Sequence, residues 1–154
     1  MVRIIHAQTS EHYECIRTLF LRYAASLDFD LGFQHFEDEL EALPGDYAPP
    51  GGCLILAEET GKWAGCVALR SLEDDICEMK RLYVLPDFRG RGIGKILAQA
   101  VIHEARSRGY AKMRLDTVES MHAARTLYAS LGFYPIGAYR YNPIDGASFM
   151  ELKL

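Results

Sequence analysis

The chain has 154 residues, a length that suits a single domain with one core, and we expect that domain to span residues 1–154. Its formal net charge of −4 excludes the generally basic surface that nucleic-acid binding requires. No apolar run approaches the ~20 residues of a membrane helix, and charged residues interrupt the N-terminal segment where a signal peptide would be apolar. We therefore expect a cytoplasmic protein without a membrane partner.

The first half of the chain alternates between the periodicities of strands and helices. Apolar residues that recur at every second position predict strands, and those that recur every three or four positions predict helices. The predicted elements are, in chain order, a strand (2–8), a helix that Ser10 caps (10–27), an acidic helix (32–43), a loop (44–52) and two hairpin strands (53–59 and 63–70).

The second half continues this pattern as far as the last residue. Its predicted elements are a strand that ends before Pro86 (76–84), a helix (92–107), a strand (111–118), a helix that Ser120 caps (120–131) and two strands (133–139 and 147–154) joined by a turn at 142–146. Gly109 and Gly132 follow the two helices, as C-terminal glycines commonly do. The order of strands and helices predicts an α/β fold with a mixed sheet.

A glycine-rich turn precedes the helix at 92–107, in the segment LPDFRGRGIGKILAQAV at 85–101. The first N–H groups of a helix have no internal partner, and the helix dipole adds positive charge there. Glycine lets a ligand approach the backbone closely, and Arg89 and Arg91 add charged donors. The turn therefore predicts a phosphate site. It matches neither a Walker A loop nor a dinucleotide fingerprint, because Lys95 and Ile96 stand where those patterns need other residues.

Arg89, Gly92 and Gly94 match the pattern R/Q-x-x-G-x-G/A, which resembles the signature of the GNAT superfamily of acyl-CoA-dependent N-acyltransferases. The segment LYASLGF at 127–133 and the order of the elements resemble the same family. The resemblance implies a mixed, mostly antiparallel central sheet flanked by helices. It also implies that the two central strands, at 76–84 and 111–117, splay apart where the acyl thioester lies.

The resemblance further implies that acetyl-CoA is the acyl-donor cosubstrate. The turn would hold its pyrophosphate, and the backbone at 82–84 would pair with the pantetheine arm. The expected cofactor residues are Leu82, Tyr83, Val84, Arg89, Gly90, Arg91, Gly92, Ile93, Gly94 and Lys95. Met121 departs from the family pattern, because many members carry asparagine at this position.

Two residues are the candidates for acid–base chemistry. Tyr128 matches the tyrosine that protonates the departing thiolate in many members, and a phenol keeps its proton at pH 7. Its alternative role is that of a core tyrosine. Glu78 lies on an expected central strand, where some members place the base that deprotonates the amine. Its alternative role is a salt bridge with Lys80, Arg81 or Arg70.

The resemblance predicts transfer of an acetyl group to a primary amine of a small molecule, by direct attack in a ternary complex. Acetylation of a protein lysine or N-terminus and a non-catalytic acyl-CoA sensor remain alternatives. A thiolate intermediate on Cys77 is a third, disfavoured because no histidine lies beside it in sequence. Tyr139 and Tyr141, on a late loop, are expected to line the acceptor pocket, and their alternative role is to cover the edge of the sheet. The scattered cysteines and histidines predict no metal site, and a homodimer stays open.

Overall fold

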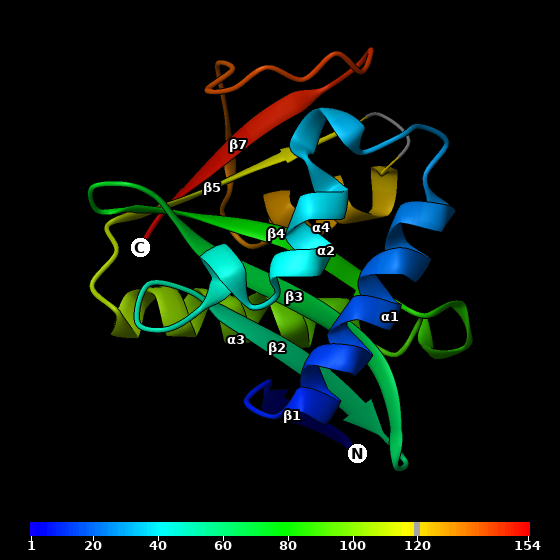
Figure 1. Ribbon diagram of the computed structural model, residues 1–154. Coiled ribbons are helices and arrows are strands. Elements are labelled where there is room, and N and C mark those ends of the chain that lie inside the picture. Colours follow the sequence, from blue (N-terminus) through cyan, green and yellow to red (C-terminus); the bar gives the residue numbers. More distant parts are fainter. Residues whose placement is uncertain (119–120) are drawn as a thin grey trace.

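The computed structural model describes residues 1–118 and 121–154 of the chain (Figure 1). Its centre is a seven-stranded sheet in the order β1-β2-β3-β4-β5-β7-β6. Only β4 and β5 run parallel, and all other neighbours are antiparallel. The predicted mixed, mostly antiparallel sheet is thus confirmed. The strands are β1 (Val2–His6), β2 (Cys53–Glu59), β3 (Lys62–Glu73), β4 (Ile76–Val84), β5 (Lys112–Thr117), β6 (Tyr134–Ile136) and β7 (Ser148–Lys153).

Helices cover both faces of the sheet (Figure 1). They are α1 (Ser10–Ser26), α2 (Phe36–Ala42), α3 (Ile93–Ser107) and α4 (His122–Ser130). Two apolar clusters fill the space between the layers: one joins α1 and α2 to the sheet, and the other joins α3 and α4 to its opposite face. The predicted order of strands and helices is confirmed. In the described part of the chain, no helix combines the length and the apolar character needed to cross a bilayer.

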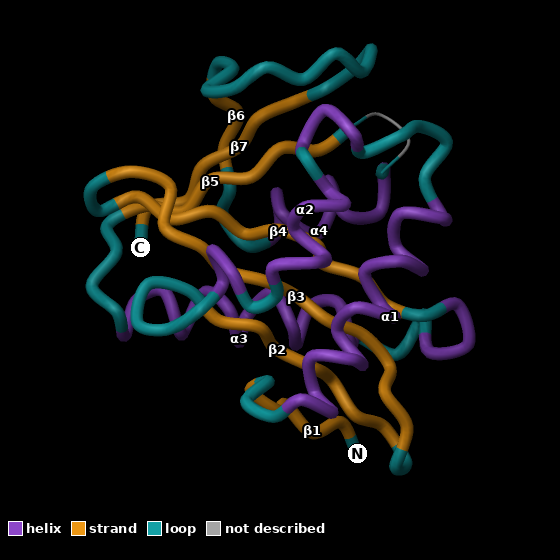
Figure 2. The backbone as a smooth tube through the Cα atoms, viewed as in Figure 1, coloured by secondary structure: helices purple, strands orange, loops and turns teal. Residues whose placement is uncertain are grey.

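Three local predictions differ from the structure. Thr9, not Ser10, caps α1, and its hydroxyl accepts a hydrogen bond from the His12 N–H at 3.1 Å. The acidic helix is split, because His35 adopts a left-handed backbone (φ 56°) between a 3₁₀ turn at Gly32–Gln34 and α2. The predicted cap Ser120 lies outside the described residues. β6 is short, so a long loop at 137–147 replaces the turn predicted before β7 (Figure 2).

The two central strands part after Glu78, close to a β-bulge at Arg81. β4 pairs with β5 only from Ile76 to Glu78, and no described strand occupies that edge of β4 beyond this point. The register between β3 and β4 shifts near Arg81, whose φ is 60°. Such a bulge inserts an extra residue and twists the strand. The splay expected between the central strands is therefore present, and it opens the sheet at its centre.

Candidate active site

Unpaired backbone donors line the glycine-rich turn. Gly92 is the N-terminal cap of α3 and supplies no side chain to the first turn of the helix. Gly90 and Gly92 both adopt left-handed backbone (φ 79° and 78°), which explains the need for glycine at these positions. No hydrogen-bond acceptor is found among the described residues for the N–H groups of residues 90–95. A Cβ atom on Gly92 would meet nothing within 4 Å, so there is open space beside the turn at this residue.

Positively charged side chains surround the turn. Arg89 lies over the ring of Tyr83, at 5.8 Å from its centroid, and its Nε donates to the Val84 carbonyl oxygen at 3.0 Å. Arg91 lies over Phe88 at 5.5 Å, and Lys95 is exposed on the first turn of α3. Together with the dipole of α3, these cations make the turn a site for an anion.

Two neighbouring cavities connect this turn to the centre of the sheet. The smaller cavity, about 320 Å³, lies between the turn, the end of β4 and the start of α4. The larger cavity, about 470 Å³, lies at the splay between β4 and β5 and extends to the segment that follows α1. Both are lined by Leu82, Arg89, Ala123 and Ala124. A long ligand anchored at the turn can therefore reach the splayed strands.

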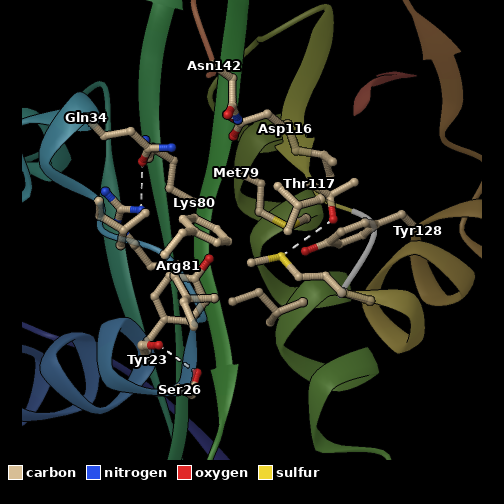
Figure 3. Close-up of a pocket in the computed structure, with 18 of the residues that line it drawn as sticks. Tyr23, Ser26, Gln34, Met79, Lys80, Arg81, Asp116, Thr117, Tyr128 and Asn142 are labelled. Atoms are coloured by element: carbon tan, nitrogen blue, oxygen red, sulfur yellow. Dashed lines mark hydrogen bonds between the residues drawn. The ribbon is translucent and has the colours of Figure 1, made fainter. Parts of the chain in front are cut away.

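Tyr128 stands at the wall of the larger cavity, on α4 (Figure 3). Its ring packs on Phe133, with centroids 5.6 Å apart, and belongs to the core cluster beneath α3. Its hydroxyl has no hydrogen-bond partner among the described residues. Burial raises the pKa of the phenol above its ordinary value, so the hydroxyl keeps its proton at neutral pH. The residue thus combines a packed ring with a free donor.

Glu78 lies apart from both cavities. Its side chain is 0% exposed and forms ion pairs with Arg70, at 2.8 Å, and with Arg140. The hydroxyl of Tyr139 donates to its second oxygen at 2.7 Å. The alternative role for Glu78, a salt bridge with Arg70, is therefore present, whereas Lys80 forms no ion pair with it. This geometry favours an ion-pair cluster that ties the loop at 137–147 to β4.

The two tyrosines expected at the acceptor pocket line neither cavity. Tyr139 donates to Glu78 and packs on Phe149, with ring centroids 5.3 Å apart, while Tyr141 is 75% exposed. Their loop reaches the cavity through Asn142 instead, which donates to the Asp116 carboxylate at 3.2 Å. The sequence therefore indicated the correct loop, but Asn142, and neither of the two tyrosines, lines the larger cavity.

Charged residues that sequence reasoning did not select line the larger cavity on the α1 side of the sheet (Figure 3). Lys80 donates to the Gln34 side-chain oxygen at 2.9 Å, and Arg81 holds Glu39 through two hydrogen bonds of 3.0 Å. Strict alternation along a strand would place neighbours on opposite faces, but the bulge at Arg81 lets both side chains reach Gln34. The sequence feature that could have indicated these cavity residues is the pair of adjacent basic residues, Lys80 and Arg81, within a strand expected at the centre of the sheet.

Neither a thiolate nor a metal site accompanies these residues in the described part of the chain. Cys77 is buried and donates to the Lys112 carbonyl oxygen at 3.4 Å, and burial raises the pKa of its thiol to about 12. That pKa disfavours the thiolate that a covalent intermediate would need. Among the described residues, no three His, Cys, Asp or Glu side chains gather to hold a metal ion. Met121 lines the larger cavity, and its sulfur accepts from the Thr117 hydroxyl at 3.6 Å.

Comparisons with known proteins agree with this geometry. The model of the Acetyltransferase (GNAT) family matches residues 13–133. An uncharacterised N-acetyltransferase of Schizosaccharomyces pombe is 37% identical over 90% of this chain and 86% of its own. The N-acetylaspartate synthetase of Xenopus tropicalis is 37% identical over 68% of this chain but only 39% of its own length. The crystal structure of PaiA N-acetyltransferase from Thermoplasma acidophilum in complex with coenzyme A covers 100% of this chain and 99% of its own, with a TM-score of 0.76 and 16% identity.

Proposed function

The chain belongs to the GNAT family of acetyltransferases, and from this premise we propose that it acetylates the primary amine of a small molecule by direct attack within a ternary complex. One observation carries the proposal. The cavity beside the glycine-rich turn adjoins the larger cavity at the splay, and the free hydroxyl of Tyr128 lies at the wall of the latter. Donor and acceptor can therefore be held together, with a proton donor beside them.

The residues around the smaller cavity fit coenzyme A. The free N–H groups of residues 90–95 suit its pyrophosphate, and Arg89 and Arg91 add charge-assisted hydrogen bonds. The open edge of β4 at Leu82–Val84 suits the amide groups of the pantetheine arm, which can pair with it like an additional strand. When bound, acetyl-CoA supplies the activated acetyl group as a thioester.

Tyr128 is proposed as the general acid. A thiolate departs more readily when a nearby acid supplies a proton. A phenol carries its proton at neutral pH, and burial, which raises the pKa of Tyr128, keeps it in that protonated state. The Tyr128 hydroxyl forms no hydrogen bond with any described residue, so it is free to donate to the sulfur of the departing thiolate.

Asp116 is the cavity-lining group best suited to receive the amine. It lies on β5 across the splay from Lys80, and Asn142 orients its carboxylate. No cation of the described residues forms an ion pair with it, so an ammonium can bind there before it loses its proton. A lysine-type ammonium with a pKa of about 10.4 needs about 4–5 kcal/mol to become neutral at pH 7, whereas an α-amine with a pKa near 8 needs only about 1–1.5 kcal/mol. An acceptor of low pKa therefore demands less of a base.

The size of the acceptor space supports a small molecule. The segment after α1 forms part of the wall of a cavity of about 470 Å³, a volume in the range of small-molecule sites. One relative is named for N-acetylaspartate, which is itself an acetylated small molecule. The proposal is tested by incubating the protein and acetyl-CoA with a panel of small amines and with peptides, while CoA release is followed. Faster release with peptides than with every small amine would favour a protein acceptor.

Initial rates should show a ternary complex. The buried thiol of Cys77 is a poor nucleophile and lines neither cavity, so no covalent acetyl-enzyme is expected. Double-reciprocal plots at several acetyl-CoA concentrations should give intersecting lines for any acceptor found in the panel. Parallel lines together with Cys77 acetylation in the mass spectrum would establish a ping-pong mechanism instead.

Gly92→Glu should abolish measurable acetyl-CoA binding. The new carboxylate would lie beside the N–H groups proposed to hold the pyrophosphate, where negative charge repels negative charge. Gly92→Ala is the matched control, because both variants strain the same left-handed backbone (φ 78°) but only one adds a charge. Calorimetry should show much weaker binding for Gly92→Glu than for Gly92→Ala. Equal affinities in folded proteins would remove the pyrophosphate from this turn.

A further inference from the structure

Lys80 is a buried lysine that has no anionic partner among the described residues. Its side chain lines the larger cavity from β4, and the residue is only 6% exposed. Its ammonium group donates a single hydrogen bond, to the uncharged oxygen of Gln34 at 2.9 Å, and forms no ion pair with any described residue. Buried lysines are ordinarily paired. This one has unused donors at the wall of the proposed acceptor cavity.

The neighbouring cations already have their counter-ions. Arg81, beside Lys80 on β4, is held by both oxygens of Glu39 from α2. Arg70, on β3, pairs with Glu78 and with Asp46. Lys80 is therefore the cavity-lining ammonium whose charge the described residues leave uncompensated. A small anionic group in the cavity would complete its hydrogen bonds and balance its charge.

We propose that Lys80 binds a carboxylate of the acceptor, so that the acceptor is a free amino acid or a closely related small amino carboxylate. The inference rests on the proposed function and names the substrate class of the same site. The wall of the cavity also carries the opposite charge, because Asp116 on β5 lacks a cationic partner among the described residues. An ammonium at Asp116 and a carboxylate at Lys80 are the two charges of an amino acid.

The electrostatics of the cavity agree with this assignment. Burial, together with the positive charges of Arg81 and Arg70, lowers the pKa of the Lys80 ammonium to about 7, although Asp116 and Glu39 oppose the shift. A bound carboxylate would favour the protonated form and raise this pKa again. Binding should therefore be accompanied by proton uptake above pH 7, which gives a readout independent of turnover.

The first experiment compares the standard amino acids with their α-carboxamides, which keep the shape but lose the negative charge. Because the amide also lowers the pKa of the neighbouring amine, each kcat/KM is divided by the fraction of the acceptor that carries a neutral amine at the assay pH. Wild-type protein should acetylate at least one amino acid with a kcat/KM about 10- to 100-fold above that of its amide, the range for a hydrogen bond to a charged group. Lys80→Met should remove this preference mainly by raising KM for the amino acid. Lys80→Arg, which keeps the charge, should restore part of it. Lys62→Met, in the exposed hairpin, is the surface control.

The outcomes separate this inference from the proposed function. Equal acetylation of acids and amides would overturn the inference and leave small-amine acetylation standing. An equal fall in kcat for acids and amides in Lys80→Met would also overturn it, since that pattern belongs to a base or a structural residue. Acetyl-CoA binding without turnover of any amine would overturn both proposals.

The second experiment titrates N-acetylated amino acids, the expected products, into the CoA-bound protein. These probes carry a carboxylate but no amine, so any proton exchange belongs to the protein. At pH 8, calorimetry in buffers of different ionisation enthalpy should show uptake approaching one proton, because a group with a pKa near 7 is then about nine-tenths neutral. Proton uptake should vanish near pH 6, where Lys80 is already protonated. The affinity for the N-acetylated amino acids should fall by up to about tenfold per pH unit above 7. Binding of these probes without uptake, or with the same uptake in Lys80→Met, would overturn the assignment.

Discussion

Tyr128→Phe is expected to lower the turnover number by roughly 10²–10⁴, the usual contribution of a general acid, with little change in acetyl-CoA affinity. The substitution removes only the hydroxyl and leaves the ring packed on Phe133. Because no described residue accepts a hydrogen bond from that hydroxyl, its loss strands no buried partner and should hardly change the free energy of unfolding. Steady-state kinetics with a panel substrate, together with acetyl-CoA calorimetry, measure both quantities.

The control for this prediction is Tyr13→Phe, which removes a hydroxyl from a half-buried tyrosine on α1 that lines neither cavity of the proposed site. Its turnover should equal that of the wild type. If Tyr128→Phe also keeps wild-type turnover, and the absence of a product burst shows that chemistry limits the rate, Tyr128 serves only as a core residue. A proportional loss of acetyl-CoA affinity would instead indicate damage to the cofactor cavity.

Local patterns explain why much of the fold could be predicted. β4 begins and ends where predicted, at Ile76 and Val84, because a polar turn precedes it and Pro86 follows it. His35 shows where such reasoning fails: the helical pattern at 32–43 is unbroken, yet the residue turns left-handed. The bulge at Arg81 could not be predicted from the sequence either. The residues of a strand do not reveal its register, which is fixed only when the neighbouring strand pairs with it.

The candidate site likewise contains features that local sequence determines and features that only the folded chain determines. The glycine-rich turn and Tyr128 lie in short motifs whose chemistry depends on local backbone or on one helix, so the sequence alone suggested them. The partners of Glu78 could not be found in this way. Arg140 lies 62 positions away along the chain, and only the folded loop at 137–147 brings it to β4. The same loop turns Tyr139 inward and presents Asn142 to the cavity.

Glu78→Gln is expected to reduce the free energy of unfolding by about 3–5 kcal/mol, the range measured when one partner of a buried ion pair is removed. Glu78 is 0% exposed, and its two oxygens receive Arg70, Arg140 and the hydroxyl of Tyr139. Glutamine keeps the shape but loses the charge, so Arg140 would lose its carboxylate partner while mostly buried, and Arg70 would keep only the ion pair with Asp46 at 3.5 Å. Glu58→Gln is the control, because its ion-pair partner Arg3 is 69% exposed and stays hydrated when the carboxylate is lost, so this pair should contribute less than about 1 kcal/mol.

The pH dependence of the rate decides between the two roles considered for Glu78. If the residue only holds the loop at 137–147 against β4, folded Glu78→Gln protein should keep the wild-type shape of its pH–rate profile, even though it unfolds at lower denaturant concentration. If the residue is the base, turnover should be low at neutral pH and should recover as pH rises, because more of the acceptor is already neutral. Recovery should then be easier for an acceptor of lower pKa, which needs less free energy to lose its proton. Selective recovery of this kind, with little change in the free energy of unfolding, would contradict the ion-pair role and indicate that Glu78 is the base.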